Sequence, residues 1–196
     1  AALNGTVGVD RDIRGMIFDA TGNTLPATEP ATDETYFVDN DPPVLSGLET
    51  SPLVYLENDD PTPITNDLVV SDAAGSSLAS ASVSIIAGHV DSEDVLAADT
   101  TGTSISASYN SSTGVLTLTG ADSITNYQQV LRSVTYENTS ELPAAQTRMI
   151  AFVVNDELFA STAAIRDVNV SSENDNPQLI VPVSQTTDED VTLTFS

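Results

Sequence analysis

The sequence contains no cysteine and no tryptophan, and it has a single histidine, His89. Without cysteine the chain has no disulfide, no thiol chemistry and no thiolate metal site. One imidazole without a second imidazole or thiolate at ligand spacing is a weak basis for a transition-metal site. The sequence also lacks a Gly-x-Ser-x-Gly elbow and a phosphate-binding loop. A carboxylate pair could hydrolyse a glycoside, but nothing selects one pair, so we expect no enzyme.

Basic residues are scarce as well. The chain has five, all of them arginine, against 29 acidic residues, which gives a net charge of −24. This charge would repel nucleic acid and anionic membranes, so neither is expected as a partner. It favours cations as ligands, a salty medium, or both. The alternative interpretation is a solvated acidic surface that keeps the protein soluble.

Long hydrophobic runs are absent too. No window approaches the roughly 18 apolar residues of a membrane span, and the first residues do not resemble a signal peptide. We therefore expect no direct membrane insertion, and a chain that is either mature or an excerpt of a longer protein. The segment Val191–Phe195 has the alternation of a strand with no partner after it, which favours an excerpt.

Two similar acidic segments are the clearest positive feature. Asp39-Asn40-Asp41-Pro42-Pro43 and Glu173-Asn174-Asp175-Asn176-Pro177 are 134 positions apart, counted between their first asparagines. Arg14-x-Met16-x-Phe18 lies 134 positions before Arg148-x-Ile150-x-Phe152. Recurrence at a fixed offset indicates a repeat unit, and the carboxylate and amide oxygens of its joints suit calcium.

The two joints divide the chain into three units. Residues 42–176 are predicted to form one complete repeat. Residues 1–41 would be the end of a preceding β repeat or a small β unit of another kind. Residues 177–196 would be the first strand or strands of a following repeat.

Alternating Ser, Thr, Val and Ala residues, with turn residues about every ten positions, predict an all-β fold, specifically a β-sandwich. The segment Asn110–Gly114 is predicted to be a hairpin turn. Ile124, Tyr127 and Leu131 have helical spacing, so a short crossover helix is expected over 124–131, with Ser123 as its N-cap. The candidate strands cover residues 53–57, 64–71, 81–87, 104–109, 114–119, 133–137, 149–155 and 163–170.

Individual residues outside the joints have simpler interpretations. The acidic run from His89 to Asp94 is expected to be an exposed loop, and the alternative interpretation is a calcium or transition-metal site. Arg148 begins a strand in an acid-rich protein, so a salt bridge to a nearby carboxylate is expected. Tyr127 and Tyr136 are expected to be core or edge aromatics.

In their order and spacing, several segments resemble the cadherin-like tandem repeats of large extracellular adhesins, and also chondroitin-sulphate-proteoglycan-type repeats. The opening is similar in Asn40–Leu45, Leu56–Asp59 and Leu68–Asp72. The middle is similar in Asp94–Leu96, Leu116–Gly120 and Tyr127–Tyr136, and the end in Arg148–Asp156 and Asn174–Pro177. The resemblance covers roughly residues 39–190.

The resemblance implies a Greek-key β-sandwich of cadherin or immunoglobulin type, an extracellular or cell-surface location, and calcium at the joints between repeats. It places Glu57, Asp72 and Asp156 with the second joint, beside Asn174, Asp175 and Asn176, and it adds Glu189 from the following repeat. Asp39, Asn40 and Asp41 would serve the preceding joint.

The joints depart from the family pattern Asp-x-Asn-Asp-Asn. Ser172 stands at the first Asp of the second joint, while Val38 and Pro42 replace the first Asp and the last Asn of the first joint. Fewer carboxylates predict weaker binding or fewer ions. The alternative for each joint is a turn in which Asn and Asp cap backbone groups.

The predicted function is mechanical and adhesive, as a calcium-stiffened repeat of a surface adhesin or filament whose partners are neighbouring repeats and cell-surface glycans. One alternative is a filament or sheath subunit assembled by strand exchange without essential calcium, with residues 1–38 or 183–196 ordered only in the assembly. The other is a carbohydrate- or ice-binding module, which the lack of tryptophan and of a regular Thr-x-Thr array disfavours. The sequences that begin at Asn4, Asn110, Asn138 and Asn169 have the form of N-glycosylation sequons, which predicts a glycoprotein.

Overall fold

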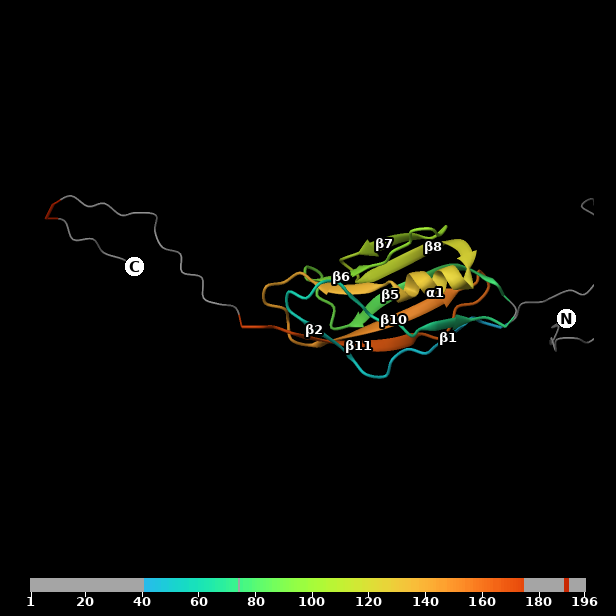
Figure 1. Ribbon diagram of the computed structural model, residues 1–196, viewed down its shortest axis with the longest axis horizontal. Helices are drawn as coiled ribbons and strands as arrows, with labels where there is room; N and C mark the ends of the chain where they lie inside the picture. Colours follow the sequence, from blue (N-terminus) through green and yellow to red (C-terminus); the bar gives the residue numbers. More distant parts are fainter. Residues whose placement is uncertain (1–40, 74, 175–188, 191–196) are drawn as a thin grey trace, which may run out of the picture.

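The computed structural model describes residues 41–73, 75–174 and 189–190, and this part of the chain is mostly β-sheet with one short helix (Figure 1). The elements, in chain order, are β1 (Val44–Ser46), β2 (Leu53–Leu56), β3 (Thr62–Pro63), β4 (Val69–Ser71), β5 (Ser77–Ala87), β6 (Asp94–Ala97), β7 (Ser106–Asn110), β8 (Val115–Ser123), α1 (Ile124–Arg132), β9 (Thr135–Asn138), β10 (Thr147–Asn155) and β11 (Ala164–Ser171).

One large sheet dominates the described fold. Its strand order is β2-β11-β10-β5-β8-β7, and every neighbouring pair is antiparallel except β2 and β11, which run parallel. A three-stranded sheet with the order β3-β9-β6 and the pair β1-β4 complete the strands. Pro63 lies in β3, an outer strand of the small sheet, where a missing N–H does not interrupt a central ladder.

In the described part of the chain, one apolar core lies between the inner face of the large sheet and the elements that cover it. Successive side chains of a strand point to opposite faces of its sheet, and in β10 the inward-facing Ile150, Phe152 and Val154 are all fully buried. They pack in one cluster with Val70 from β4 and with Tyr136 from β9. The helix adds Tyr127, Val130 and Leu131, all fully buried. Tyr127 and Tyr136 are thus core aromatics, as the sequence predicted.

The chain enters and leaves this domain at opposite ends. β10 and β11 are antiparallel, with Thr147 beside Asn169 and Phe152 beside Ala164. The distal end is therefore where β2 and β11 stop together and β10 begins, around Leu56 and Ser171. The proximal end contains the β10–β11 connection, and residues 42–45 line a small cleft there with residues 162–164. In Figure 1 the described chain begins at the right and leaves at the left.

Most of the predicted elements are present, with shifted ends. The helix spans Ile124–Arg132, and the Ser123 hydroxyl accepts a hydrogen bond from the Asn126 N–H, which confirms the predicted N-cap. The turn before β8 is also confirmed, because Gly114 has a φ of 66° and its N–H donates to the Asn110 carbonyl. An added Cβ at Gly114 would lie 2.7 Å from the His89 ring, so the position requires glycine.

The predicted strand over 64–71 is wrong for its first half. Only Val69–Ser71 is a strand. The Thr65 hydroxyl accepts hydrogen bonds from the N–H groups of Asp67 and Leu68, which makes residues 65–68 a turn. The short strands β1, β3 and β6 were not predicted.

The described residues include the predicted unit 42–176 except for residues 74, 175 and 176. The flanking units, 1–41 and 177–196, lie outside that part except for Asp41 and the turn at Glu189 and Asp190. Among the described residues no helix has the length and hydropathy needed to cross a membrane.

Candidate functional site

Glu57 is the most unusual acidic residue at the distal end. It directly follows β2 and is only 3 % exposed. Its N–H donates to the Ser171 carbonyl at 2.9 Å, and its Oε2 accepts a hydrogen bond from the Glu173 N–H at 2.9 Å. Its buried Oε1 has no hydrogen-bond partner among the described residues. A buried carboxylate with an unsatisfied oxygen is costly, which makes Glu57 a candidate cation ligand.

The turn after Glu57 fixes the position of this carboxylate. Asn58 adopts a positive φ of 65°, a conformation that asparagine tolerates better than most residues. The Asp59 Oδ2 accepts from the Leu56 N–H at 2.9 Å, and its carbonyl accepts from the Tyr55 hydroxyl at 2.6 Å. The Tyr55 ring packs edge-on against Tyr136, with centroids 5.0 Å apart. The turn is therefore anchored in the core.

At the proximal end, Asp41 and Asp72 line an open cleft of about 440 Å³, together with Pro42, Val44, Ser71 and Ala73. Asp72 follows β4, and its Oδ1 accepts a hydrogen bond from the Gly75 N–H at 2.9 Å. This contact matches the alternative interpretation for such residues, in which the carboxylate caps a turn. The same cleft nevertheless brings Asp72 close to the joint residue Asp41.

Asp156 combines the properties of a turn residue and of a candidate ligand. Its Oδ1 accepts hydrogen bonds from the N–H groups of Leu158 and Phe159, both at 2.7 Å, in the connection from β10 to β11. Its Oδ2 is buried and has no hydrogen-bond partner among the described residues. Asp156 therefore closes a turn with one oxygen and keeps the other available.

The structure divides the predicted ligand set between the two ends. Asp72 and Asp156 were expected beside Glu57 and Asn174, but they lie at the proximal end, whereas Glu57 and the exposed Asn174 lie at the distal end. The physical reason is the antiparallel pairing of β10 with β11, which carries Asp156 away from Ser171. In the described residues, no three His, Cys, Asp or Glu side chains are close enough to hold a metal ion.

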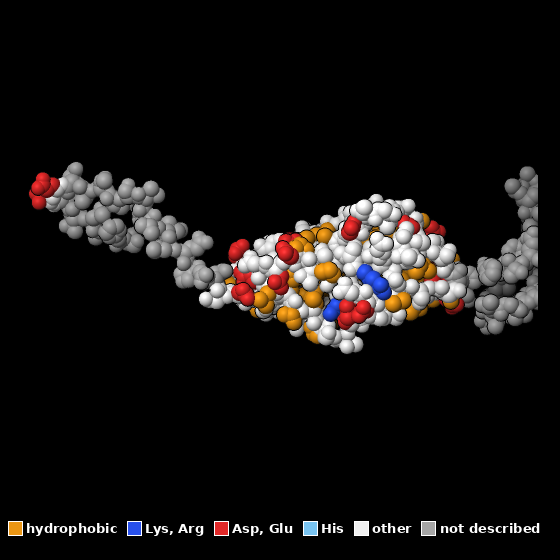
Figure 2. Space-filling view, viewed as in Figure 1, with side chains coloured by type: hydrophobic (Ala, Val, Ile, Leu, Met, Phe, Trp, Pro, Cys, Tyr) orange, Lys and Arg blue, Asp and Glu red, His pale blue; other side chains and the backbone are white. Residues whose placement is uncertain are grey.

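Most of the remaining predicted ligands lie outside the described residues. Asp39, Asn40, Asp175 and Asn176 lie outside the described residues. Glu189 lies in an exposed turn with Asp190, and the segment that joins this turn to the domain is outside the described part as well. Acidic side chains do gather toward the distal end in the view of Figure 2, on the left, while the visible basic side chains lie near the middle.

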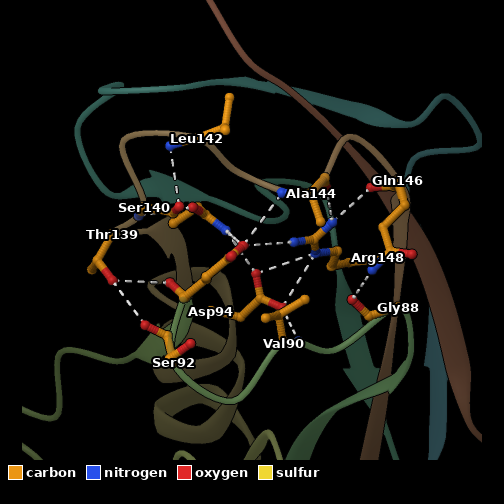
Figure 3. Close-up of polar contacts among 12 residues, drawn as sticks. Gly88, Val90, Ser92, Asp94, Thr139, Ser140, Leu142, Ala144, Gln146 and Arg148 are labelled. Carbon is orange, nitrogen blue, oxygen red and sulfur yellow. Dashed lines mark hydrogen bonds and ion pairs between the residues drawn. The ribbon is translucent and has the colours of Figure 1, made fainter.

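A second polar cluster, around Asp94, was missed by the sequence analysis (Figure 3). Asp94 was expected in an exposed loop, but it begins β6 and is 1 % exposed. Its carboxylate lies 3.2 Å from the fully buried Arg148 Nε and accepts from the Tyr136 hydroxyl at 2.6 Å. It also accepts from the Asn138 side chain at 3.0 Å and the Val90 N–H at 2.7 Å.

Arg148 connects this cluster to the loop between β9 and β10. Its Nη1 donates to the carbonyls of Ala144 and Gln146 at 2.7 and 3.0 Å, and its Nη2 lies 3.7 Å from a Glu93 carboxylate oxygen. The predicted salt bridge of Arg148 is confirmed. The Arg148 Nη2 has no hydrogen-bond partner among the described residues, so Glu93 compensates it only as an ion pair. The hydrogen bonds from Arg148 Nη1 to Ala144 and Gln146 tie the β9–β10 loop to the buried Asp94–Arg148 pair.

The cluster also affects nearby tyrosines. Burial raises the pKa of Tyr109 to about 12, and the negative charge of Asp94 adds to this effect. Burial and the hydrogen bond to Asp94 raise the pKa of Tyr136 as well.

The Asn138 sequon is part of this cluster, since its side chain is hydrogen-bonded to Asp94 and only 5 % exposed. A glycan at Asn138 is therefore incompatible with the folded chain, unlike one at the exposed Asn110 or Asn169.

No protein-family model and no curated protein matches this chain.

Proposed function

We propose that the chain is a cadherin-like repeat, a Greek-key β-sandwich from a long extracellular adhesin or filament, in which calcium stiffens the joints between repeats. Its role is structural and adhesive rather than catalytic. The single observation that supports this most strongly is the carboxylate of Glu57. It is 3 % exposed, it is tied to the segment that leaves the domain, and one of its oxygens has no partner among the described residues.

The cost of this arrangement argues for a cation. A buried charge without a partner is unfavourable by several kcal/mol, so it persists where something compensates it. Among the described residues, the Glu57 carboxylate accepts a hydrogen bond from the Glu173 N–H. No group of three or more His, Cys, Asp or Glu side chains that could hold a metal ion is found in this part of the chain. Asn174 follows at once, and the joint residues Asp175 and Asn176 come next in the chain. Hard oxygen ligands of this kind are those that calcium prefers.

The arrangement of the two ends fits a tandem repeat. The chain enters at the end that carries Asp41, Asp72 and Asp156, and it leaves at the end that carries Glu57. In a row of such units the distal end of one repeat would face the proximal end of the next. Each junction would then combine Glu57 and the residues 174–176 of one unit with residues equivalent to Asp72 and Asp156 of the following unit.

This division changes the ligand sets that we propose. The second joint would use Glu57, Asn174, Asp175 and Asn176. Glu189 is not retained for this joint, because the 134-residue offset aligns it with Tyr55 of β2, which lies near the distal end of its unit. The first joint would use Asp39, Asn40 and Asp41 with Asp72 and Asp156. Bound calcium would supply positive charge between carboxylates that otherwise repel. The contribution of this chain is a set of oxygens held in place by the β2–β11 pair and by the β10–β11 turn.

Thermal unfolding of the full chain tests the proposal. We expect a calcium-specific rise in melting temperature, in millimolar calcium compared with magnesium or with chelator, because an ion that binds the folded state stabilises it. The variant Glu57→Gln keeps the shape and removes the charge, so it should lose a large part of that rise. Glu141→Gln, at an exposed glutamate in the β9–β10 loop, is the matched control and should keep it.

The proposal fails if calcium does not shift the melting temperature of the unaltered chain. It also fails if Glu57→Gln and Glu141→Gln respond to calcium equally, since the acids would then act only as a solvated surface. In either case a filament subunit assembled by strand exchange becomes the better explanation. Binding of a carbohydrate or ice panel by the unaltered chain would instead favour a ligand-binding module.

A further inference from the structure

The outer face of the six-stranded sheet differs from the rest of the molecule. Register places three rows of mostly small polar residues across β7, β8 and β5: Ser106, Thr119 and Ser80; Ser108, Thr117 and Ser82; and Asn110, Val115 and Ser84, in which Val115 is the one apolar member. The alternate residues of these strands, such as Leu116, Leu118 and Val83, are buried on the inner face. The sequence does not show this array, because its rows combine three separate segments.

The other half of the outer face is apolar. Four of the exposed large hydrophobic residues lie there: Val54 on β2, Ile165 on β11, Met149 on β10 and Ile86 on β5, exposed by 65, 46, 37 and 53 %. Ala151 and Val153 of β10 share this face, opposite Ser84 and Ser82 of β5. An exposed apolar group of this kind, bordered by polar residues, is typical of a contact surface.

Charge is nearly absent from the outer face. Of the outward-facing residues that the structure describes on the six strands, only Asp167, which lies opposite Met149, carries a charge. The chain as a whole carries −24. Two copies of this chain therefore repel each other at most approaches, and the outer face is where close contact places the fewest like charges together.

The size of the outer face suits a protein–protein contact. Six strands about 4.8 Å apart, each contributing about eight residues at about 3.3 Å, span roughly 700 Å². A standard stable interface buries about 800 Å² on each partner. The face is thus close to the area that a modest dimer requires, and none of its residues lines either of the two clefts described at the proximal end.

We propose that the outer face of the six-stranded sheet is a homotypic contact surface, which packs against the same face of a second copy of this chain. A cationic partner would instead be attracted to the acidic ends. In a long surface protein, many weak contacts of this kind would join neighbouring molecules side by side. The proposal is independent of calcium, which concerns the two ends of the domain.

Sedimentation velocity of the full chain, in chelator and over a range of concentrations, tests this contact. We expect a reversible dimer with a dissociation constant of ~1–100 µM, at the weak end for an interface of this size. Association should tighten as salt rises from 0.1 to 1 M, because the screening length falls from about 10 Å to about 3 Å and like charges repel less. A contact with an oppositely charged partner would respond in the other direction.

Charge insertion tests the location. Thr117→Glu on β8 and Ile165→Glu on β11 each place a carboxylate on the exposed outer face, and each should weaken the dimer by about tenfold or more. Thr125→Glu makes the same change at an exposed position of α1, which is not part of that face. It should leave the dissociation constant within about twofold. Melting temperatures of all three variants verify that they are folded.

Three outcomes overturn the proposal. The unaltered chain could remain monomeric at all concentrations and salt levels. Thr125→Glu could weaken association as much as Thr117→Glu does. The monomeric chain could instead bind ice or a crystalline polysaccharide and lose this binding with Thr117→Glu, which would assign the Ser and Thr rows to a solid surface. Because chelator is present throughout, none of these results depends on whether calcium binds at the joints.

Discussion

At the scale of single residues, the acids of this chain serve different purposes although they are equivalent in the sequence. Asp94 is buried and satisfied by four neighbouring residues, Glu57 is buried with one oxygen unsatisfied among the described residues, and many others are exposed. The acid-rich composition predicted a carboxylate partner for Arg148 but not which carboxylate it would be. Asp94 was misassigned because an acidic run looks like solvated loop until its tertiary partners are known.

The Asp94–Arg148 pair should be a major stability determinant. Removal of one partner leaves the other buried and charged, so Arg148→Met is expected to lower the free energy of unfolding by about 3–5 kcal/mol. Arg132→Met is the matched control, because Arg132 is half-buried and donates one hydrogen bond, from Nε to the Leu68 carbonyl. Its cost should be about 1 kcal/mol. Urea denaturation of both variants measures the difference.

A second variant separates the charge from the packing. The double variant Asp94→Asn with Arg148→Met removes both charges. It should cost less than the sum of the two single changes, because each single change leaves one uncompensated buried charge and the double variant leaves none. Additive costs, or an Arg148→Met cost no larger than that of Arg132→Met, would contradict the assignment of a buried ion pair.

At the scale of elements, the sequence predicted the helix, whose signals are local, but not the short strands, which lack such signals. The helix has its cap and its apolar spacing within ten residues, and both were visible in the sequence. β3 and β6 span two and four residues, and each is a strand only because β9 lies beside it. Such elements depend on distant partners. The first part of the strand predicted over 64–71 failed for a different, local reason, since the Thr65 hydroxyl accepts from the N–H groups of Asp67 and Leu68 and forms a turn there.

Glu49 shows how side chains hold the connections between elements. It lies between β1 and β2, and its carboxylate accepts from the Thr65 hydroxyl at 2.6 Å and the Asn66 N–H at 3.0 Å. Arg166 of β11 lies 3.1 Å away and also donates to the Ile64 carbonyl. Burial alone would raise the pKa of Glu49, but these hydrogen bonds and the arginine lower it below its ordinary value of 4.5.

The sign of this shift gives a pH prediction. A carboxylate with a lowered pKa stabilises the fold above its ordinary pKa of 4.5, and this contribution is lost as pH falls through the folded-state value. Unaltered protein should therefore lose more stability between pH 5 and about pH 3 than Glu49→Gln does. Urea unfolding at several pH values measures this. Glu141→Gln serves as the exposed control, and its profile should follow that of the unaltered chain; identical profiles for all three would contradict the role of Glu49.

At the scale of the whole molecule, topology decides which acids can act together. The recurrence of the joints at a fixed offset predicted a repeat with functional ends. The sequence could not divide the ligands between the ends, because that division follows from strand direction. Parallel β2 and β11 bring Glu57 to Ser171, and antiparallel β10 carries Asp156 to the other end.

This division predicts where calcium should act on the chain. Hydrogen exchange in calcium should slow at both ends, at the Glu173 N–H that donates to Glu57 and at the Leu158 and Phe159 N–H groups that donate to Asp156. Amides of the central strands β5 and β10 exchange by global opening, so they should change only as overall stability changes. Asp156→Asn should abolish the calcium response at the proximal end and leave that of Glu173 intact, whereas Glu57→Gln should do the reverse. A uniform response along the chain, or loss of both responses in either variant, would show that the two ends do not bind calcium separately.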